Sequence, residues 1–341
     1  MNTSNIDVIT SSKPELNRNF RIERIKAPHI SKIIRIILNL NYTNKVTLFC
    51  YLLTLALSVF SVCVNSMLTH YSSGETYYTK YLFLTMLLCT LMLLVRIYRK
   101  HLPAIKLFVP LLCAFFSLVI VLTFSNVLRF TPIHTIDLTL YKLDLMLGID
   151  QNQIMNWVFS HKYLVLVLRL AYASLGFQVI FLTLPIFIFF SQKSSESFLA
   201  KLALVNLLGL TIYYFFPTAS PASVLSHQHL VSGQINLALA FKQIHQGIIP
   251  SDLGDGLISF PSFHIIWSTL YTYTFRTKRW VFYPLLVLNA ILACSTFLLG
   301  WHYFVDIVGG WFVMAVAIFV VDVYPKLSYK NNKQKTQTCN A

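Results

Sequence analysis

Long apolar stretches, separated by short polar and basic segments, run along the whole chain. About 20 apolar residues cross a bilayer as a helix. Runs of suitable character lie near residues 46–67, 81–98, 105–128, 163–190, 198–216, 262–275, 280–300 and 303–323. The pattern predicts an all-α fold, a polytopic integral membrane helix bundle with about eight transmembrane helices. The run at 262–275 is short, and its hydroxyl side chains favour a helix buried within the bundle.

Composition supports the same class. Of 341 residues, 56% are hydrophobic and only 11% are charged, whereas soluble domains carry about 25% charged residues. The net charge of +15 comes from basic segments between the apolar runs, as membrane topology requires. We therefore expect the lipid bilayer as a partner and no nucleic acid, and the oligomeric state stays open.

Lysine and arginine are concentrated in alternate connections, and such connections face the cytoplasm. With an even number of helices, both termini are expected in the cytoplasm and the active site on the periplasmic or lumenal face. We expect a basic N-terminal segment (1–42), a polytopic catalytic domain (43–325) and a basic tail (326–341). Residues 30–40 could form an interfacial helix or simply lead into the first span.

Two connections on the expected outer side are long. Residues 132–160 are too polar to span and predict an amphipathic element on the surface. The loop 217–261 reads as a solvated path for substrate, and its candidate metal ligands are His227, His229, His245, Asp252 and Asp255. Their spacing supplies no third ligand at a usual interval, so we expect no metal and no cofactor.

Candidate chemistry lies where polar segments meet apolar runs. If residues 303–323 form a helix, Asp306 lies one turn after His302, on the same face. A carboxylate bonded to one imidazole nitrogen fixes the tautomer and leaves the other nitrogen free to attack. The alternative is a histidine of the interfacial belt beside Trp301 and Tyr303. An acid inside an apolar run is costly and usually functional, which favours the first interpretation.

A second histidine follows Pro261-Ser262, a typical helix start. The backbone N–H groups of Phe263 and His264 would then point outward and form an anion site, to which the Ser262 hydroxyl adds a donor. His264 could act as a general acid or base. The alternative is a helix cap that happens to precede a histidine.

These residues carry a resemblance. Pro-Ser-Phe-His at 261–264, followed by Ser295-x6-His302-x3-Asp306, resembles the type 2 phosphatidic acid phosphatase superfamily, whose motifs are K-x6-R-P, P-S-G-H and S-R-x5-H-x3-D. The resemblance covers about residues 125–325, a six-helix phosphatase-like core. Phe-Pro-Ser-Phe-His and His-Tyr-Phe-Val-Asp are most similar to the inositol phosphorylceramide synthase, or inositolphosphotransferase, branch. It implies a triad of His264, His302 and Asp306, with His302 as the nucleophile that becomes a phosphohistidine.

The sequence departs from the phosphatase motifs at three cationic positions. Gly209 and Phe216 stand where K-x6-R-P has Lys and Arg, and Thr296 follows Ser295 where the motif has Arg. A phosphomonoester carries nearly two charges and favours a cationic clamp, whereas a diester carries one and can be held by hydroxyl and N–H groups. Arg169 could replace a lost cation or extend to the membrane surface.

Three functions remain open from the sequence. The first is a lipid phosphotransferase that moves a phospho-headgroup from a phospholipid donor to a hydroxyl acceptor, with Ser262, Phe263, Ser295 and Arg169 as candidate substrate-binding residues. The second is a lipid phosphate phosphatase with water as acceptor. The third is a non-catalytic membrane protein or transporter. The sequence identifies neither headgroup nor acceptor.

Overall fold

The computed structural model describes residues 38–68, 83–91 apart from 85 and 89, 108–248, 250 and 258–329. The chain divides into two compact units, Met1–Asn39 and Leu40–Ala341, and the fold below is that of the second. Most of the predicted interfacial helix at 30–40 and most of the run at 81–98 lie outside the described residues, as does the end of the basic tail.

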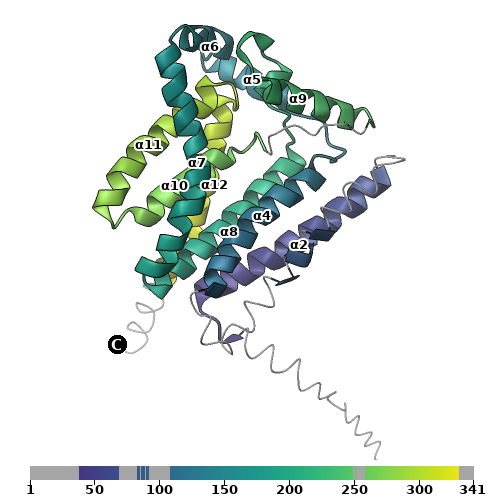
Figure 1. The fold of residues 1–341 in the computed structure, drawn as a ribbon. Coiled ribbons are helices and arrows are strands. Elements are labelled where there is room, and N and C mark those ends of the chain that lie inside the picture. Colours follow the sequence, from purple (N-terminus) through teal and green to yellow (C-terminus); the bar gives the residue numbers. More distant parts are fainter. Residues whose placement is uncertain are drawn as a thin grey trace, which may run out of the picture. The chain divides into compact units, whose positions relative to one another are not determined.

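Every regular element in the described part of the chain is a helix (Figure 1). Six helical segments there are long and apolar enough to cross a membrane: α2 (Tyr42–Leu68), α4 (Phe108–Leu128), α7 (Lys162–Phe189), α8 (Gln192–Phe215), α11 (Arg279–Leu298), and α12 (Phe304–Ile318) with its continuation to Tyr329. The predicted all-α membrane bundle is confirmed. The run at 262–275 forms α10 (Phe263–Phe275), whose 13 residues are fewer than the about 20 that a span needs.

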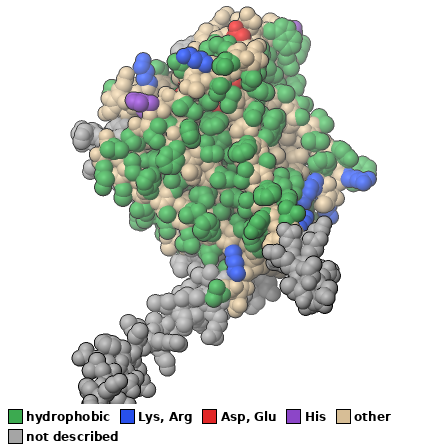
Figure 2. Space-filling view, turned by 180° about the vertical axis from the view of Figure 1, so that it is seen from behind, with side chains coloured by type: hydrophobic (Ala, Val, Ile, Leu, Met, Phe, Trp, Pro, Cys, Tyr) green, Lys and Arg blue, Asp and Glu red, His purple; other side chains and the backbone are tan. Residues whose placement is uncertain are grey.

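Helix α8 lies at the centre of the bundle and packs against α2, α4, α7, α10 and α12. Within its apolar window 72% of the residues are buried, against 28% for α7. Helix α7 contributes less to the core, and many of its apolar side chains, such as Phe177 and Ile180, are exposed. Figure 2 shows a face covered largely by hydrophobic side chains, with Lys and Arg toward its edges. A surface of this kind suits a lipid environment.

Short helices gather at one end of the bundle (Figure 1). They are α5 (Asp137–Met146), α6 (Gln151–Phe159) and α9 (Ser232–His245), with short 3-10 turns at Pro221–Ser223 and His227–His229. The predicted amphipathic element at 132–160 is thus two helices. Asp150 caps α6 by accepting hydrogen bonds from the N–H groups of Asn152 and Gln153. Helix α6 therefore begins only a few residues after α5 ends.

A partly buried ionic cluster lies toward the other end of α12, where the helix widens into a π-helical turn at Phe319–Val323. The Lys201 ammonium lies 3.1 Å from the Asp322 carboxylate, and Tyr273 donates a hydrogen bond to Asp322 over 2.9 Å. Arg276 approaches the same carboxylate at 4.0 Å. These contacts join α8, α10 and α12, far along the helix from its first turn.

Removal of the Asp322 carboxylate should destabilise the bundle. Asp322→Ala leaves the Lys201 charge buried without its carboxylate, and loss of one partner of a buried pair costs about 3–5 kcal/mol. Thermal unfolding in detergent should show the loss as a lower melting temperature. The double variant Lys201→Met/Asp322→Leu, which removes both charges, should recover part of it. An Asp322→Ala protein as stable as the wild type would show that the pair does not hold these helices together.

Candidate functional site

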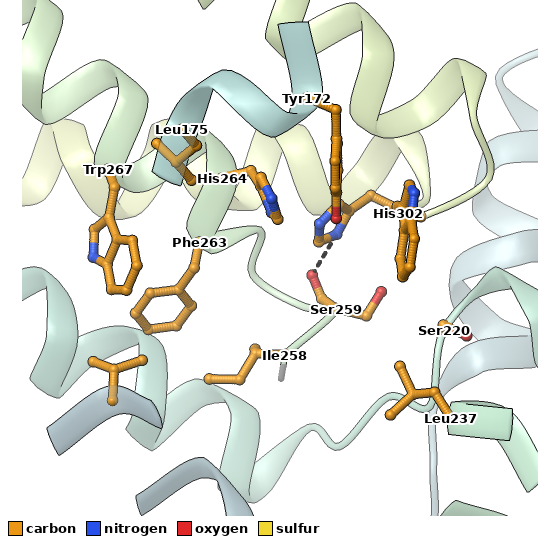
Figure 3. Close-up of a pocket in the computed structure, with 12 residues that line it drawn as sticks. Tyr172, Leu175, Ser220, Leu237, Ile258, Ser259, Phe263, His264, Trp267 and His302 are labelled. Atoms are coloured by element: carbon orange, nitrogen blue, oxygen red, sulfur yellow. Dashed lines mark hydrogen bonds between the residues drawn. The ribbon is translucent and has the colours of Figure 1, made fainter. Parts of the chain in front are cut away.

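A cavity of about 360 Å³ is lined by residues of α4, α7, α9 and α10, of the segments before α10 and of the turn before α12 (Figure 3). Both candidate histidines line it, and most of the remaining wall is apolar or aromatic. Its lining consists of Val121, Tyr172, Leu175, Ser220, Leu237, Ile258, Ser259, Phe263, His264, Trp267, Trp301 and His302. A concave apolar pocket with a few converging polar groups is the usual form of a small-molecule or lipid site.

The hydrogen bonds of His302 define its tautomer. Its Nδ1 lies 2.9 Å from the backbone oxygen of Ser259 and 3.2 Å from Asp306 Oδ2. A carbonyl oxygen can only accept, so Nδ1 carries the proton and Nε2 keeps its lone pair. Nε2 is 3.2 Å from the Ser262 hydroxyl. The sequence argument left open which ring nitrogen the carboxylate contacts; here that nitrogen is Nδ1.

Asp306 is fully buried in the first turn of α12. Besides His302, its Oδ2 accepts hydrogen bonds from the Ser259 hydroxyl at 2.8 Å and from the backbone N–H of Tyr303 at 3.0 Å. An acid near a helix N-terminus is favoured by the helix dipole. One carboxylate oxygen thus joins the start of α12, the imidazole and the segment before α10.

Helix α10 begins at the cavity. Ser262 is its N-cap, 3.5 Å from the N–H of Ile265, and the first turn presents backbone N–H groups to the space beside His302. The rings of His264 and His302 lie 5.7 Å apart between centroids. His264 is stacked on Tyr172 at 4.2 Å, and Tyr172 on Trp301 at 5.4 Å. This stack orients the His264 ring, which the structure brings together with His302.

A tight turn between α11 and α12 presents His302. Gly300 has φ +74°, a conformation that favours glycine, and a Cβ there would lie 2.8 Å from Met155. The N–H groups of Trp301 and His302 both reach the Thr296 carbonyl. The buried Gln151 side chain of α6 donates to the His302 carbonyl at 2.9 Å. The backbone of the nucleophile candidate is therefore held from two helices.

Two carboxylates of α5 accept hydrogen bonds from backbone segments next to the site. Asp144 is fully buried and accepts hydrogen bonds from the N–H groups of Phe304 and Val305 at 2.8 and 3.2 Å, so it caps α12 from another helix. Asp137, two turns earlier, accepts from the N–H groups of Ala219 and Ser220. Burial raises the pKa of Asp137 to about 6, against the opposing effect of these hydrogen bonds. The geometry thus gives each acid a positioning role.

Phe263 lines the cavity, and its ring lies against α8. A Cβ on Gly209 would stand 2.6 Å from Cζ of Phe263, so the ring occupies the space that a larger side chain at 209 would need. Phe216, at the second cationic position of the motif, is exposed. Thr296 is fully buried, and its hydroxyl donates to the Ala293 carbonyl of its own helix.

Three of the four predicted substrate-binding residues are not among the residues that line this cavity. Ser262 is fully buried, and its hydroxyl contacts His302 Nε2. Ser295 is buried and donates to the Leu292 carbonyl of α11. Arg169 is exposed and lines a neighbouring cavity of about 320 Å³, which shares Tyr172 and Trp301 with the first. The aromatic pair thus forms part of the wall of both cavities.

Sequence reasoning missed several residues of the site. Ser259 binds both Asp306 and His302, and its position three residues before Ser262 was a usable signal. Nothing local pointed to Tyr172 and Ser220, because they come from distant segments and meet the site only in the fold. Among the described residues no group of three or more His, Cys, Asp or Glu side chains could hold a metal.

The comparisons identify the family. No curated protein and no solved structure matches the chain. A family model described as the PAP2 superfamily matches residues 138–320, a range that contains both histidines, Asp306, Asp144 and all of α10 and α11. Members of this superfamily are phosphatases or phosphotransferases that act on phosphoesters. Since the match covers more than half of the chain, the protein belongs to the PAP2 superfamily.

Proposed function

We propose that this protein is a membrane lipid phosphotransferase that moves a phospho-headgroup from a phospholipid to a hydroxyl acceptor, in the manner of the inositol phosphorylceramide synthase branch. One observation supports the transferase over the phosphatase. The Phe263 ring fills the space at Gly209, where the phosphatase motif that the sequence resembles has Lys. The exchange removes a positive charge from the cavity and replaces it with an apolar surface.

The other two cationic positions of that motif support the same proposal. Phe216 brings no charge, and Thr296 turns its hydroxyl into its own helix. No Lys or Arg is among the residues that line the cavity. A doubly charged monoester loses more from such a site than a singly charged diester, because charges buried without partners are costly. A phosphodiester donor therefore fits better than phosphatidic acid.

In the first half-reaction, His302 Nε2 attacks the phosphorus of the donor and the phosphorus–oxygen bond to the lipid alcohol breaks. Burial lowers the pKa of His264 to about 3, so the negative charge of the bound phosphate has to favour its protonated form. Protonated His264 then gives its proton to the leaving oxygen. The headgroup phosphate is then bound to Nε2. Asp306 stabilises the positive charge that forms on the imidazole, and the Ser259 carbonyl keeps the proton on Nδ1.

In the second half-reaction, neutral His264 takes the proton of an acceptor hydroxyl, whose oxygen attacks the phosphorus and releases His302. The Ser262 hydroxyl, which contacts Nε2 at 3.2 Å before reaction, becomes available to a phosphoryl oxygen when Nε2 attacks. The backbone N–H groups at the start of α10 face the same charge. The apolar wall formed by Leu175, Phe263 and Trp267 suits the lipid part of the donor or acceptor.

Arg169 takes a different role from a clamp on the reacting phosphate. Arg169 lines the neighbouring cavity, which shares Tyr172 and Trp301 with the cavity of His302. It is not among the residues that line the cavity of His302. We propose that this second cavity receives the donor headgroup, with Arg169 as a hydrogen-bond donor to it.

The test is a competition between donor classes. Purified protein in vesicles should turn over a diester such as phosphatidylinositol faster than phosphatidic acid, and a new phospholipid should form only when ceramide or diacylglycerol is present. His302→Ala should abolish turnover and any acid-labile phosphoenzyme. Release of inorganic phosphate from phosphatidic acid, faster than turnover of any diester, would reject the transferase and support the phosphatase. No turnover of either class would favour a non-catalytic protein.

A paired substitution tests the charge argument directly. Gly209→Lys alone should destabilise the protein, since its Cβ would meet the Phe263 ring. The double variant Phe263→Gly/Gly209→Lys has room for the ammonium and should shift the ratio of kcat/KM toward phosphatidic acid by about tenfold, equivalent to about 1.4 kcal/mol. The control Phe263→Gly/Gly209→Met has similar length without charge. An equal shift in both double variants would assign the effect to shape.

The rate should decrease at acidic pH only below about pH 6.5, the unperturbed pKa of histidine. Burial lowers the pKa of His302 to about 4, although the hydrogen bond to the Ser259 carbonyl opposes the shift, so the neutral, nucleophilic form persists as pH falls through 6.5, its unperturbed value. The acid limb of kcat/KM should therefore lie below pH 6.5. Protonation of Asp137, whose pKa is about 6, contributes to the upper part of this limb, and Asp137→Asn should remove that part. A limb centred above 6.5 would contradict the nucleophile assignment.

We also propose that the active site faces the periplasm or a lumen. Lys193 and Arg279 lie in the first turns of α8 and α11, and Lys278 is the N-cap of α11. All three are at the end of the bundle that holds the Asp322 cluster, opposite to His302. Positive connections favour the cytoplasmic side.

Orientation can be measured by labelling. With the six native cysteines replaced by alanine, a cysteine in place of Gly233, where nothing lies within 4 Å of a new Cβ, should react with an impermeant thiol reagent from outside the cytoplasm. One in place of the exposed Lys278 should react only after permeabilisation. The reverse pattern would place the active site in the cytoplasm.

A further inference from the structure

Ser220 has a backbone conformation that serine rarely adopts. Its φ of 150° with ψ of 168° falls in a region populated almost only by glycine, where strain of about 1–3 kcal/mol is typical. Residues held in this way cluster at functional sites, where the surrounding structure fixes them. Ser220 is also the only non-glycine residue with positive φ in the described ranges.

The surrounding contacts hold this conformation firmly. Asp137 accepts the N–H of Ser220 at 3.1 Å, and the Ser220 carbonyl accepts the hydroxyl of Tyr303 at 3.2 Å. The same Tyr303 hydroxyl lies 3.1 Å from Asp137 Oδ1, so its single proton is shared between the two acceptors. Tyr303 directly follows His302. The backbone of Ser220 is therefore tied to the residue next to the candidate nucleophile.

The side chain of Ser220, by contrast, has no partner among the described residues. Its Oγ is buried and makes no hydrogen bond, and the residue as a whole is 2% exposed. A buried hydroxyl without a partner costs about 1–3 kcal/mol. Ser220 lines the same cavity as His302 and His264, and Figure 3 shows it on the side that Leu237 forms, across from His264.

We infer that the Ser220 hydroxyl is a hydrogen-bond donor to a phosphoryl oxygen of the substrate, and that this bond strengthens as charge develops during transfer. The inference rests on the proposed phosphoryl-transfer function but not on the choice of diester or monoester, because both carry such oxygens. It also explains how a cavity lined without Lys or Arg stabilises a negative phosphoryl group. Ser220 and Ser262 would supply hydroxyl donors from two sides, together with the N–H groups of α10.

Two substitutions separate the hydroxyl from the backbone. Ser220→Ala removes the hydroxyl and keeps a Cβ. Ser220→Gly also relieves the strained φ, so its melting temperature should be at least that of the wild type. Both should lower kcat by about 10²-fold, the typical effect of losing one such donor, with KM nearly unchanged because the bond forms mainly in the transition state. Ser226→Ala, an exposed hydroxyl in the same loop that bonds Asn152, should behave as wild type.

The assay uses vesicles that contain phosphatidylinositol or phosphatidic acid, whichever the wild type turns over. Full kcat in Ser220→Gly would mean that only the backbone conformation matters, and the inference would be wrong. A raised KM with unchanged kcat would also overturn it, since the hydroxyl would then bind ground state and transition state equally. In either case an active wild type leaves the proposed function intact. A wild type inactive on both lipids would remove the function and this inference together.

Discussion

The buried Asp306 carboxylate is the contact on which the rest of the site depends. A charge placed in the first turn of a membrane helix is costly unless every neighbour compensates it. Here the Ser259 hydroxyl, the Tyr303 N–H and the His302 ring all reach one oxygen of this carboxylate. These groups come from the loop before α10 and from the turn before α12, so their shared contact with Oδ2 ties together the two segments that carry His264 and His302. The other carboxylate oxygen, Oδ1, is buried and makes no hydrogen bond among the described residues.

The two acids of α5 extend this constraint outward. Asp144 caps the helix that contains Asp306, and Asp137 fixes the segment that contains Ser220. Both side chains lie on one face of a ten-residue helix, two turns apart. A short surface helix thereby orients both ends of the cavity without touching the reacting atoms. Such support is needed because a catalytic group displaced by about 1 Å can lose much of its effect.

Sequence reasoning found the elements whose signals are local. Apolar run length predicted the spanning helices. The spacing of His302 and Asp306 pointed to their contact but not to its basis: His302 precedes Tyr303, the N-cap of α12, so the turn before the helix brings the two side chains together rather than a shared helix face. Ser259 and Tyr172 could not be found in this way, since their roles arise from packing between segments far apart in sequence. Thr296 shows the converse limit. The resemblance places Thr296 where the phosphatase motif has Arg, yet its hydroxyl donates to a carbonyl of its own helix. Position in the motif therefore did not predict where the side chain points.

The exchange at Gly209 and Phe263 connects packing with chemistry. The aromatic ring and the missing side chain occupy the same space, so neither position can change alone without a clash or a void. A cavity built around that ring has an apolar wall where a monoester site would have a cation. Under the proposed function, such a cavity would stabilise a phosphoryl group by hydroxyl and backbone donors, whose strength depends on placement rather than on net charge. This requirement is consistent with the strained, firmly held backbone at Ser220 and with the several hydrogen bonds that fix His302. In such a site, rigid positioning of neutral donors replaces long-range electrostatic attraction.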